Sequence, residues 1–259
     1  MRYETRYRGS GSLSFPSFPN GVKWLIAANV AIFLIEFFGS LPGGVPIFRG
    51  LRLVPSDVIT GQIWELVTYL FLHSLTTFTH ILFNMLMLWM FGAPVEETWG
   101  TRRFLQYYFL CGVGAGICHV AVNLLLGNPH QPVLGASGAI FGLLLAFGMR
   151  FPEQVILLFF LFPIKAKYMV MIFGAIEFLS AFQPNSGVSN LAHLGGMVFG
   201  YFYIKNQFGA KRARLYGAKS SGFSFDLAGR WKEYKLQRAR SKFKVYMKKH
   251  GSDRDTWVN

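Results

Sequence analysis

Six long apolar stretches constrain this chain more than any other feature of its sequence. They run near residues 22–39, 78–92, 104–126, 133–150, 168–182 and 190–206. A helix needs about 20 mostly apolar residues to cross roughly 30 Å of hydrocarbon. Lipid offers the backbone no hydrogen-bond partner, so such a segment crosses as a helix that satisfies its own N–H and C=O groups. The pattern predicts an all-α membrane protein with a bundle of six transmembrane helices over residues 22–206.

Composition agrees with a membrane as the solvent. Hydrophobic residues make up 52% of the 259 residues and charged residues only 15%, whereas a soluble domain carries about 25% charged residues. No long polar linker divides the apolar part, which predicts one bundle. Two further apolar stretches do not fit the six crossings. Residues 63–75 are interpreted as an interfacial or partly inserted loop, and residues 155–164 are placed at the inner interface, with a seventh crossing as the alternative.

Lys and Arg in the connecting segments predict the orientation, because cytoplasmic loops carry an excess of both. One side would hold Arg2, Arg6, Arg8, Lys23, Arg102, Arg103, Arg150, Lys165, Lys167 and the basic C-terminus. The other side would hold Arg49 and Arg52, and its other two loops contain no Lys or Arg. Both termini are therefore expected in the cytoplasm, in a multi-pass protein of the cell membrane.

The two ends of the chain are polar. Residues 1–21 are expected to form a cytoplasmic segment without a removable signal peptide, and residues 207–259 a basic cytoplasmic tail. From Lys211 onward, 14 Lys and Arg stand against 4 Asp and Glu, which gives +10 of the net charge of +14. A basic end beside a membrane bundle favours anionic lipid over nucleic acid. Residues 231–249 have apolar residues at helical spacing, and two interpretations stay open: a solvated or disordered segment, and an amphipathic helix on anionic lipid.

Polar side chains occur at a matching depth in three of the predicted spans. The second, fourth and sixth spans start from the outer side, and they open with His80 and Asn84, with Ser137, and with His193. Polar groups inside a membrane are costly, and their default interpretation is functional. Each residue taken alone has another explanation, since Ser137 could be a packing residue and the other three could form hydrogen bonds between helices.

Small residues at four-residue spacing could bring the fourth and sixth spans together. The stripes consist of Gly138, Gly142 and Ala146, and of Ala192, Gly196 and Gly200. Such flat stripes let helix backbones approach closely. Ser137 borders the first stripe and His193 the second, so facing stripes would place the hydroxyl within hydrogen-bond reach of the imidazole.

A serine hydroxyl and a neutral imidazole in contact can perform nucleophilic catalysis, because the imidazole takes the hydroxyl proton as the oxygen attacks a carbonyl. His80 and Asn84 share one helix face and could donate hydrogen bonds to the oxyanion that develops. No Asp or Glu is placed to orient His193, so a Ser–His dyad is predicted. Phe141, one turn below Ser137, is the candidate to orient the ring.

Two carboxyl groups lie within the predicted spans. Glu177 is interpreted as a deep residue of the fifth span with a structural or gating role. Glu36 is expected near the outer end of the first span, where water can reach it.

The polar segments resemble the rhomboid family of intramembrane serine proteases. The matching segments are His80-Ile-Leu-Phe-Asn84, Gly135-Ala-Ser137-Gly138 and Ala192-His193-Leu-Gly-Gly196. The resemblance implies a six-helix core with Ser137 as the nucleophile, His193 as the base, and His80 and Asn84 at the oxyanion. It implies membrane-anchored protein substrates and no metal or organic cofactor. One departure is Trp64-Glu65 in the first outer loop, where many family members have Trp-Arg, and it puts the local pairing of that loop in question.

Three alternative functions remain. A catalytically silent rhomboid-like factor would bind membrane proteins without cutting them, although such forms typically lose the serine or the histidine. A small transporter or channel would show internal repeats and charged groups at the midplane, and no convincing repeat is present. A zinc protease would need a motif such as HExxH, which the sequence lacks.

Overall fold

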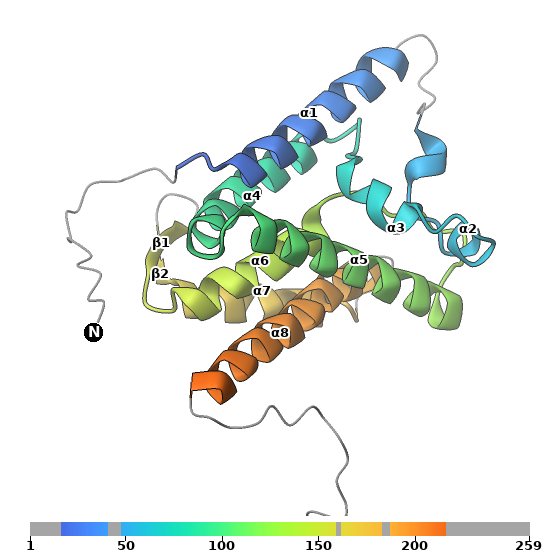
Figure 1. Ribbon diagram of the computed structural model, residues 1–259. Helices are drawn as coiled ribbons and strands as arrows, with labels where there is room; N and C mark the ends of the chain where they lie inside the picture. Colours follow the sequence, from blue (N-terminus) through green and yellow to red (C-terminus); the bar gives the residue numbers. More distant parts are fainter. Residues whose placement is uncertain (1–16, 41–47, 159–161, 183–186, 216–259) are drawn as a thin grey trace, which may run out of the picture. The chain divides into compact units, whose positions relative to one another are not determined.

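The computed structural model describes residues 17–40, 48–158, 162–182 and 187–215, and it is mostly helical (Figure 1). The longer helices are α1 Asn20–Ser40, α4 Phe78–Trp99, α5 Thr101–Leu126, α6 Ser137–Arg150, α7 Ala166–Ser180 and α8 Gly187–Leu215. Short helices η1 Arg49–Leu51, α2 Pro55–Ile59, α3 Glu65–Thr68 and η2 Tyr69–Phe71 lie between α1 and α4. The helix predicted in the tail at residues 231–249 lies outside the described residues.

Each longer helix coincides with one predicted apolar stretch. Among the described residues, α1, α4 and α5 are long and apolar enough to cross a membrane, and α6 is a shorter apolar helix. This agrees with the expected helical membrane fold, while the number of crossings stays a prediction. The sixth helix differs most from its predicted bounds, because α8 continues past residue 206 to Leu215.

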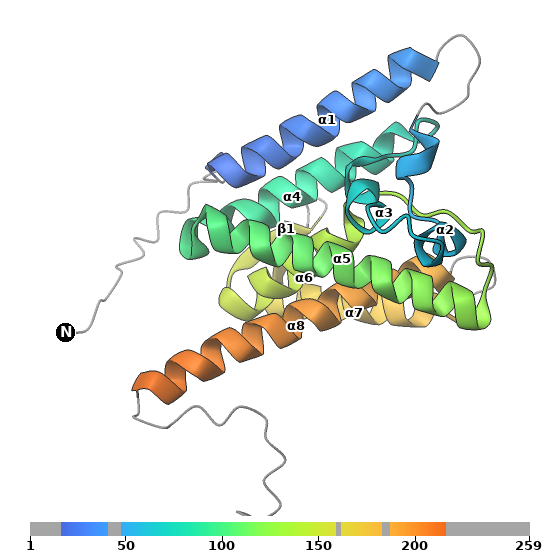
Figure 2. The ribbon, with the colours of Figure 1, turned by 45° about the vertical axis from the view of Figure 1, so that its right-hand side comes forward.

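One buried carboxylate ties the start of α1 to the turn between α4 and α5. Glu96, in the last turn of α4, accepts hydrogen bonds from the N–H groups of Gly21 at 2.7 Å and Val22 at 2.8 Å. The first N–H groups of a helix have no partner within it, so this side chain supplies one from a neighbouring helix. The Thr101 hydroxyl donates to the same carboxylate at 2.6 Å. Helix α1 then runs alongside α4 (Figures 1 and 2).

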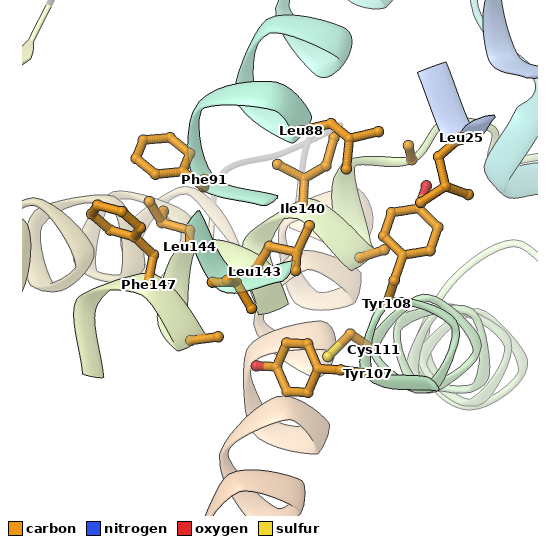
Figure 3. Close-up of a cluster of buried hydrophobic side chains, with 14 of the residues drawn as sticks. Leu25, Leu88, Phe91, Tyr107, Tyr108, Cys111, Ile140, Leu143, Leu144 and Phe147 are labelled. Carbon is orange, nitrogen blue, oxygen red and sulfur yellow. The ribbon is translucent and has the colours of Figure 1, made fainter. Parts of the chain in front are cut away.

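The core of the bundle lies where α6 packs between α4 and α5. Figure 3 shows its buried side chains, which include Leu88, Phe91, Tyr107, Tyr108, Cys111, Ile140, Leu143, Leu144 and Phe147. The Tyr107 hydroxyl donates a hydrogen bond of 2.7 Å to the Gly142 carbonyl. This bond gives the buried phenol a partner and joins α5 to α6 at a glycine where the two backbones are close.

The segment between α1 and α4 is not part of a long helix. Residues 72–77 separate η2 from α4, so the apolar run at 63–75 is a separate structure, as expected. The segment is fixed to the α5–α6 connection by a bridge between Leu53 and Val133 and by the bond from Gly135 N–H to the Tyr69 carbonyl at 2.9 Å. Within it, the buried Glu65 carboxylate accepts from Val54 N–H at 2.9 Å. Glu65, which stands where many family members have Arg, therefore has a backbone partner inside this loop.

One short hairpin between α6 and α7 departs from the otherwise helical fold. Strands β1 Val155–Leu158 and β2 Phe162–Lys165 pair antiparallel, with Val155 opposite Lys165. The run is too short to cross a membrane, and a hairpin satisfies its backbone groups without a long helix. Next to the hairpin, the exposed Glu153 contacts Lys165 and Lys167, and hydrogen bonds from these two ammonium groups lower its carboxyl pKa to about 2.

Candidate active site

Ser137 and His193 meet where the first turn of α6 lies against α8. Ser137 is the first residue of α6, and His193 lies in the second turn of α8. The Ser137 Oγ atom is 2.7 Å from His193 Nε2, within hydrogen-bond distance. The expected contact between hydroxyl and imidazole is therefore present.

Glycines allow this approach of α6 and α8. A β-carbon on Gly196 would collide with the Gly138 carbonyl group, and one on Gly142 would lie 3.3 Å from the Gly196 carbonyl oxygen. The two predicted stripes thus meet at these positions. They also face α5, because a β-carbon on Gly138 would collide with Ala115 and one on Gly200 with the Tyr107 hydroxyl. Helix α5 therefore packs against the same small residues of α6 and α8.

Two side chains hold the His193 ring. Phe141 stacks on it with ring centroids 4.6 Å apart and an angle of 12° between the planes, as expected. The expectation that no carboxylate lies in reach of His193 is wrong, because Glu177 Oε2 is 3.0 Å from His193 Nδ1. Glu177 is also less deep in its helix than expected, since it lies in the last turn of α7, three residues before Ser180. No sequence pattern indicated that Glu177 lies on the side of α7 that faces His193.

His80 and Asn84 lie beside the residues that precede Ser137. The Gly135 backbone has φ +121°, and a β-carbon there would lie 3.0 Å from His80 Nε2 and 3.8 Å from Asn84 Nδ2. The small residue therefore leaves space in front of both side-chain nitrogens. Within the described parts of the chain, the buried Asn84 Nδ2 atom has no hydrogen-bond partner, so this donor is available to a ligand that enters the space.

The position of the His80 proton follows from its neighbours. Ser74 N–H donates to His80 Nδ1 at 3.4 Å, so Nδ1 is an acceptor and Nε2 carries the proton. The Nε2–H group then faces Gly135 as a donor. His73 lies 5.2 Å from His80 between ring centroids. Burial, and next the charge of His80, lower the pKa of His73 to about 3, so this neighbour is neutral at physiological pH.

The structure thus places the Ser137 hydroxyl beside the His193 imidazole, and it places His80 and Asn84 beside Gly135, two residues before Ser137. The first N–H groups of α6 are further donors, because they have no partner within the helix. Among the described residues, no group of three His, Cys, Asp or Glu side chains could hold a metal ion. The fold and this site define a helical membrane protein with a serine–histidine pair between two of its helices.

Comparison with known proteins gives the family. The family described as the rhomboid domain matches residues 60–208, which is more than half of the chain. The protein named "Putative rhomboid protease YdcA" of Bacillus subtilis (strain 168) is 34% identical over 188 residues, covering 70% of this chain and 84% of that protein. The chain belongs to the rhomboid family.

Two further relatives are longer than the matched region. "Rhomboid protease GluP" of Bacillus subtilis (strain 168) is 33% identical over 57% of this chain and 26% of that protein. "Rhomboid protein 1, mitochondrial" of Saccharomyces cerevisiae is 30% identical over 71% of this chain and 52% of that protein. The match thus covers about a quarter and about half of these two relatives.

Proposed function

We propose that the chain is an intramembrane serine endopeptidase that cleaves membrane-anchored proteins. The observation that carries the proposal is the distance of 2.7 Å between Ser137 Oγ and His193 Nε2. Membership of a family whose members include proteins named as rhomboid proteases supports it.

Acylation begins at Ser137. Its Oγ atom attacks the carbonyl carbon of the scissile peptide bond while His193 Nε2 takes the hydroxyl proton. The carbonyl oxygen becomes an oxyanion in a tetrahedral intermediate. His193 then gives the proton to the leaving amine, the C–N bond breaks, and the acyl group stays on Ser137.

Deacylation uses water as the second nucleophile. His193 takes a proton from a water molecule as the water oxygen attacks the acyl carbon. Collapse of the second tetrahedral intermediate breaks the bond to Ser137 Oγ, which regains its proton from His193. The products are a carboxylic acid and the free enzyme, so the cycle needs no metal or organic cofactor.

The oxyanion is stabilised by His80 and Asn84. The Nε2–H of His80 and the Nδ2 group of Asn84 border the space that Gly135 leaves open. Donors that already point at this position need no reorganisation when the charge develops, and one such donor typically contributes about 10² to 10³ in rate. Gly138 and Gly196 support the site by letting α6 and α8 approach, and Phe141 by stacking on the base.

The substrate class follows from the environment of the site. A transmembrane helix keeps its carbonyl groups in internal hydrogen bonds, so the segment to be cut must unwind before Ser137 can reach a peptide bond. Helix-destabilising or small residues near the cut favour that unwinding. Proteins anchored in the same membrane are therefore the proposed substrates.

The proposed placement in the membrane has six crossings over residues 22–206, with both termini in the cytoplasm and the site near the outer face of the cell membrane. The basic loops predicted for one side support this orientation. Residues 1–21 form the cytoplasmic N-terminal segment. The tail, residues 207–259, is proposed to contact anionic lipid through its net charge of about +10.

The test is cleavage of a membrane-anchored reporter by purified protein in proteoliposomes. Wild type is expected to cleave, Ser137→Ala and His193→Ala to be inactive, and a fluorophosphonate probe to label wild type only. Equal processing by wild type and Ser137→Ala would end the proposal. Absence of cleavage and labelling, with retained binding of the reporter, would instead favour a catalytically silent binding protein.

A further inference from the structure

We propose that Glu177 completes a Ser–His–Glu triad, as a positioning residue that sets the orientation and tautomer of His193. This inference rests on the function proposed above for Ser137 and His193. The contact that carries it is the distance of 3.0 Å between Glu177 Oε2 and His193 Nδ1. Both side chains are largely removed from solvent, with 14% and 19% of their surfaces exposed.

The carboxylate selects the tautomer that catalysis needs. An ionised carboxylate only accepts hydrogen bonds, so its partner Nδ1 must carry the ring proton. The other nitrogen, Nε2, then has a free lone pair, and this atom is the one that lies 2.7 Å from Ser137 Oγ. Without a partner for Nδ1, the neutral ring could carry its proton on Nε2, where it cannot accept the serine proton.

The carboxylate also removes an ambiguity that stacking leaves. Phe141 lies nearly parallel to the His193 ring, which fixes the plane of the ring. A rotation of the ring by 180° about its Cβ–Cγ bond keeps that plane but turns Cε1 toward Ser137 in place of Nε2. Only the orientation observed directs Nδ1 at Glu177 and Nε2 at Ser137 together. Phe141 and Glu177 therefore restrict different motions of the base.

The contact strengthens as the reaction proceeds. In the resting state the carboxylate faces a neutral imidazole, and in the transition state it faces a developing imidazolium. An interaction that is stronger in the transition state than in the ground state raises kcat with little effect on KM. Loss of Glu177 should therefore appear in kcat.

The surroundings of Glu177 argue against a role in packing alone. Helix α7 otherwise exposes large apolar side chains, including Met171, Ile176 and Leu179, at 68%, 51% and 66%. A carboxyl group in such a helix is costly unless it is paired. Its partner among the described residues is His193, the proposed base. The free-energy cost of placing this carboxyl group in an apolar helix is therefore offset by its contact with the base.

The test compares Glu177→Gln with Glu177→Ala in the reporter assay. Gln keeps the shape of Glu but can present its NH₂ group to Nδ1, which favours the wrong tautomer. In triad hydrolases the corresponding acid-to-amide change lowers kcat by about 10⁴. We expect Glu177→Gln to lower kcat by about 10² to 10⁴ with KM within about threefold, and to be less active than Glu177→Ala. A packing role predicts the reverse order, because Gln is the better replacement in size and shape.

Controls separate the possible failures. Ile176→Ala, on an exposed apolar position of the same helix, should leave kcat and KM unchanged. The midpoint of SDS denaturation is measured for each variant, so that a loss of kcat is counted only in folded protein. Cleavage that requires Ser137 but is unchanged in Glu177→Gln, or lower in Glu177→Ala than in Glu177→Gln, would overturn the role of Glu177 alone. Cleavage that does not require Ser137 would instead overturn the proposed function.

Discussion

At the scale of single residues, the absence of a β-carbon at Gly135 matters both for its backbone conformation and for the space beside His80. Its φ of +121° is unfavourable for any residue with a β-carbon, and a β-carbon would lie 3.0 Å from His80 Nε2. We predict that Gly135→Ala lowers kcat by at least about 10²-fold, because the added methyl group occupies the space in front of the proposed oxyanion donor His80. Steady-state kinetics on the membrane-anchored reporter measure this.

Gly61 is the matched control for that substitution. It also has a positive φ, +114°, but no atom of the described residues lies within 4 Å of the position of its β-carbon. Gly61→Ala should therefore carry the backbone strain, on the order of 1–3 kcal/mol, without loss of kcat. If both variants lost the same fraction of activity, strain rather than the blocked space would be the cause.

Asn84 offers a second prediction at this scale. Its Nδ2 atom is buried and has no partner within the described structure, so it is free to bind the oxyanion. Asn84→Ala should lower kcat by about 10² to 10³. The control is Asn123→Ala, which removes a buried Asn whose Nδ2 bonds the His119 carbonyl within α5 and should affect stability only. Equal kcat for wild type and Asn84→Ala would remove this residue from the site.

The sequence predicted some of the contacts at the candidate site but not all of them. The apolar stretches predict a common depth for Ser137, His193, His80 and Asn84, because all of them follow the start of a predicted span, and the contact of Ser137 with His193 agrees with it. Glu177 could not be placed against His193, since α7 is apolar on most of its surface and its pattern does not say which side faces α8. For a similar reason Glu36 was expected near water, whereas it is buried and 3.6 Å from Arg52.

At the scale of helices, the contact of α6 with α8 depends on Gly196. A β-carbon there would collide with the Gly138 carbonyl group, which belongs to a helix backbone and cannot move aside. We predict that Gly196→Ala separates the two helices, abolishes fluorophosphonate labelling of Ser137, and destabilises the protein by at least about 1–3 kcal/mol. Labelling and the SDS-denaturation midpoint measure these effects.

Gly174 on α7 provides the control. The nearest atom to its added β-carbon is Met197 Cε at 3.5 Å, an ordinary contact with a flexible side chain. Gly174→Ala should therefore be neutral or stabilise the helix by up to about 1 kcal/mol. Loss of labelling in this variant as well would mean that any added methyl group in these helices disturbs the site.

Glu96 tests how the first helix is held. Its carboxylate bonds two N–H groups at the start of α1, and hydrogen bonds to charged groups contribute roughly 1.5–3 kcal/mol each. Glu96→Ala should lower the stability by on the order of 2–4 kcal/mol. The neighbouring Glu97 lies at the exposed surface, and its replacement by Ala should change stability by less than about 0.5 kcal/mol. Similar values for both would contradict the capping role.

The helices themselves could be predicted because each apolar stretch must satisfy its own backbone groups in lipid. The hairpin of β1 and β2 could not, since its apolar residues have the same composition as a membrane helix and differ only in length. The end of α8 at Leu215 was also missed. An apolar pattern shows where lipid-compatible residues stop, whereas a helix continues into water as long as its backbone bonds continue.

At the scale of the whole bundle, two sets of connections lie at opposite ends of the helices. The start of α1 and the α4–α5 turn are joined through Glu96. The segment before α4 and the α5–α6 connection are joined through the bond from Ser56 N–H to the Pro129 carbonyl at 2.8 Å. Helix α5 separates these ends by 26 residues, which is about 39 Å at 1.5 Å per residue. A membrane crossed by α5 must therefore have one set on each side.

This geometry makes the orientation testable with two cysteines. Arg102, at the α4–α5 turn, and Asn128, after α5, are both exposed, and the basic residues predict a cytoplasmic position for the first. With Cys111 and Cys118 replaced by Ala, a membrane-impermeant maleimide added to intact cells should label Asn128→Cys and leave Arg102→Cys unlabelled until the membrane is permeabilised.

The Ser137–His193 pair lies toward the Asn128 end, since Ser137 begins the helix that follows this connection. Labelling of Arg102→Cys alone would invert the chain and move the site to the cytoplasmic face, and labelling of both in intact cells would mean that α5 does not cross the membrane.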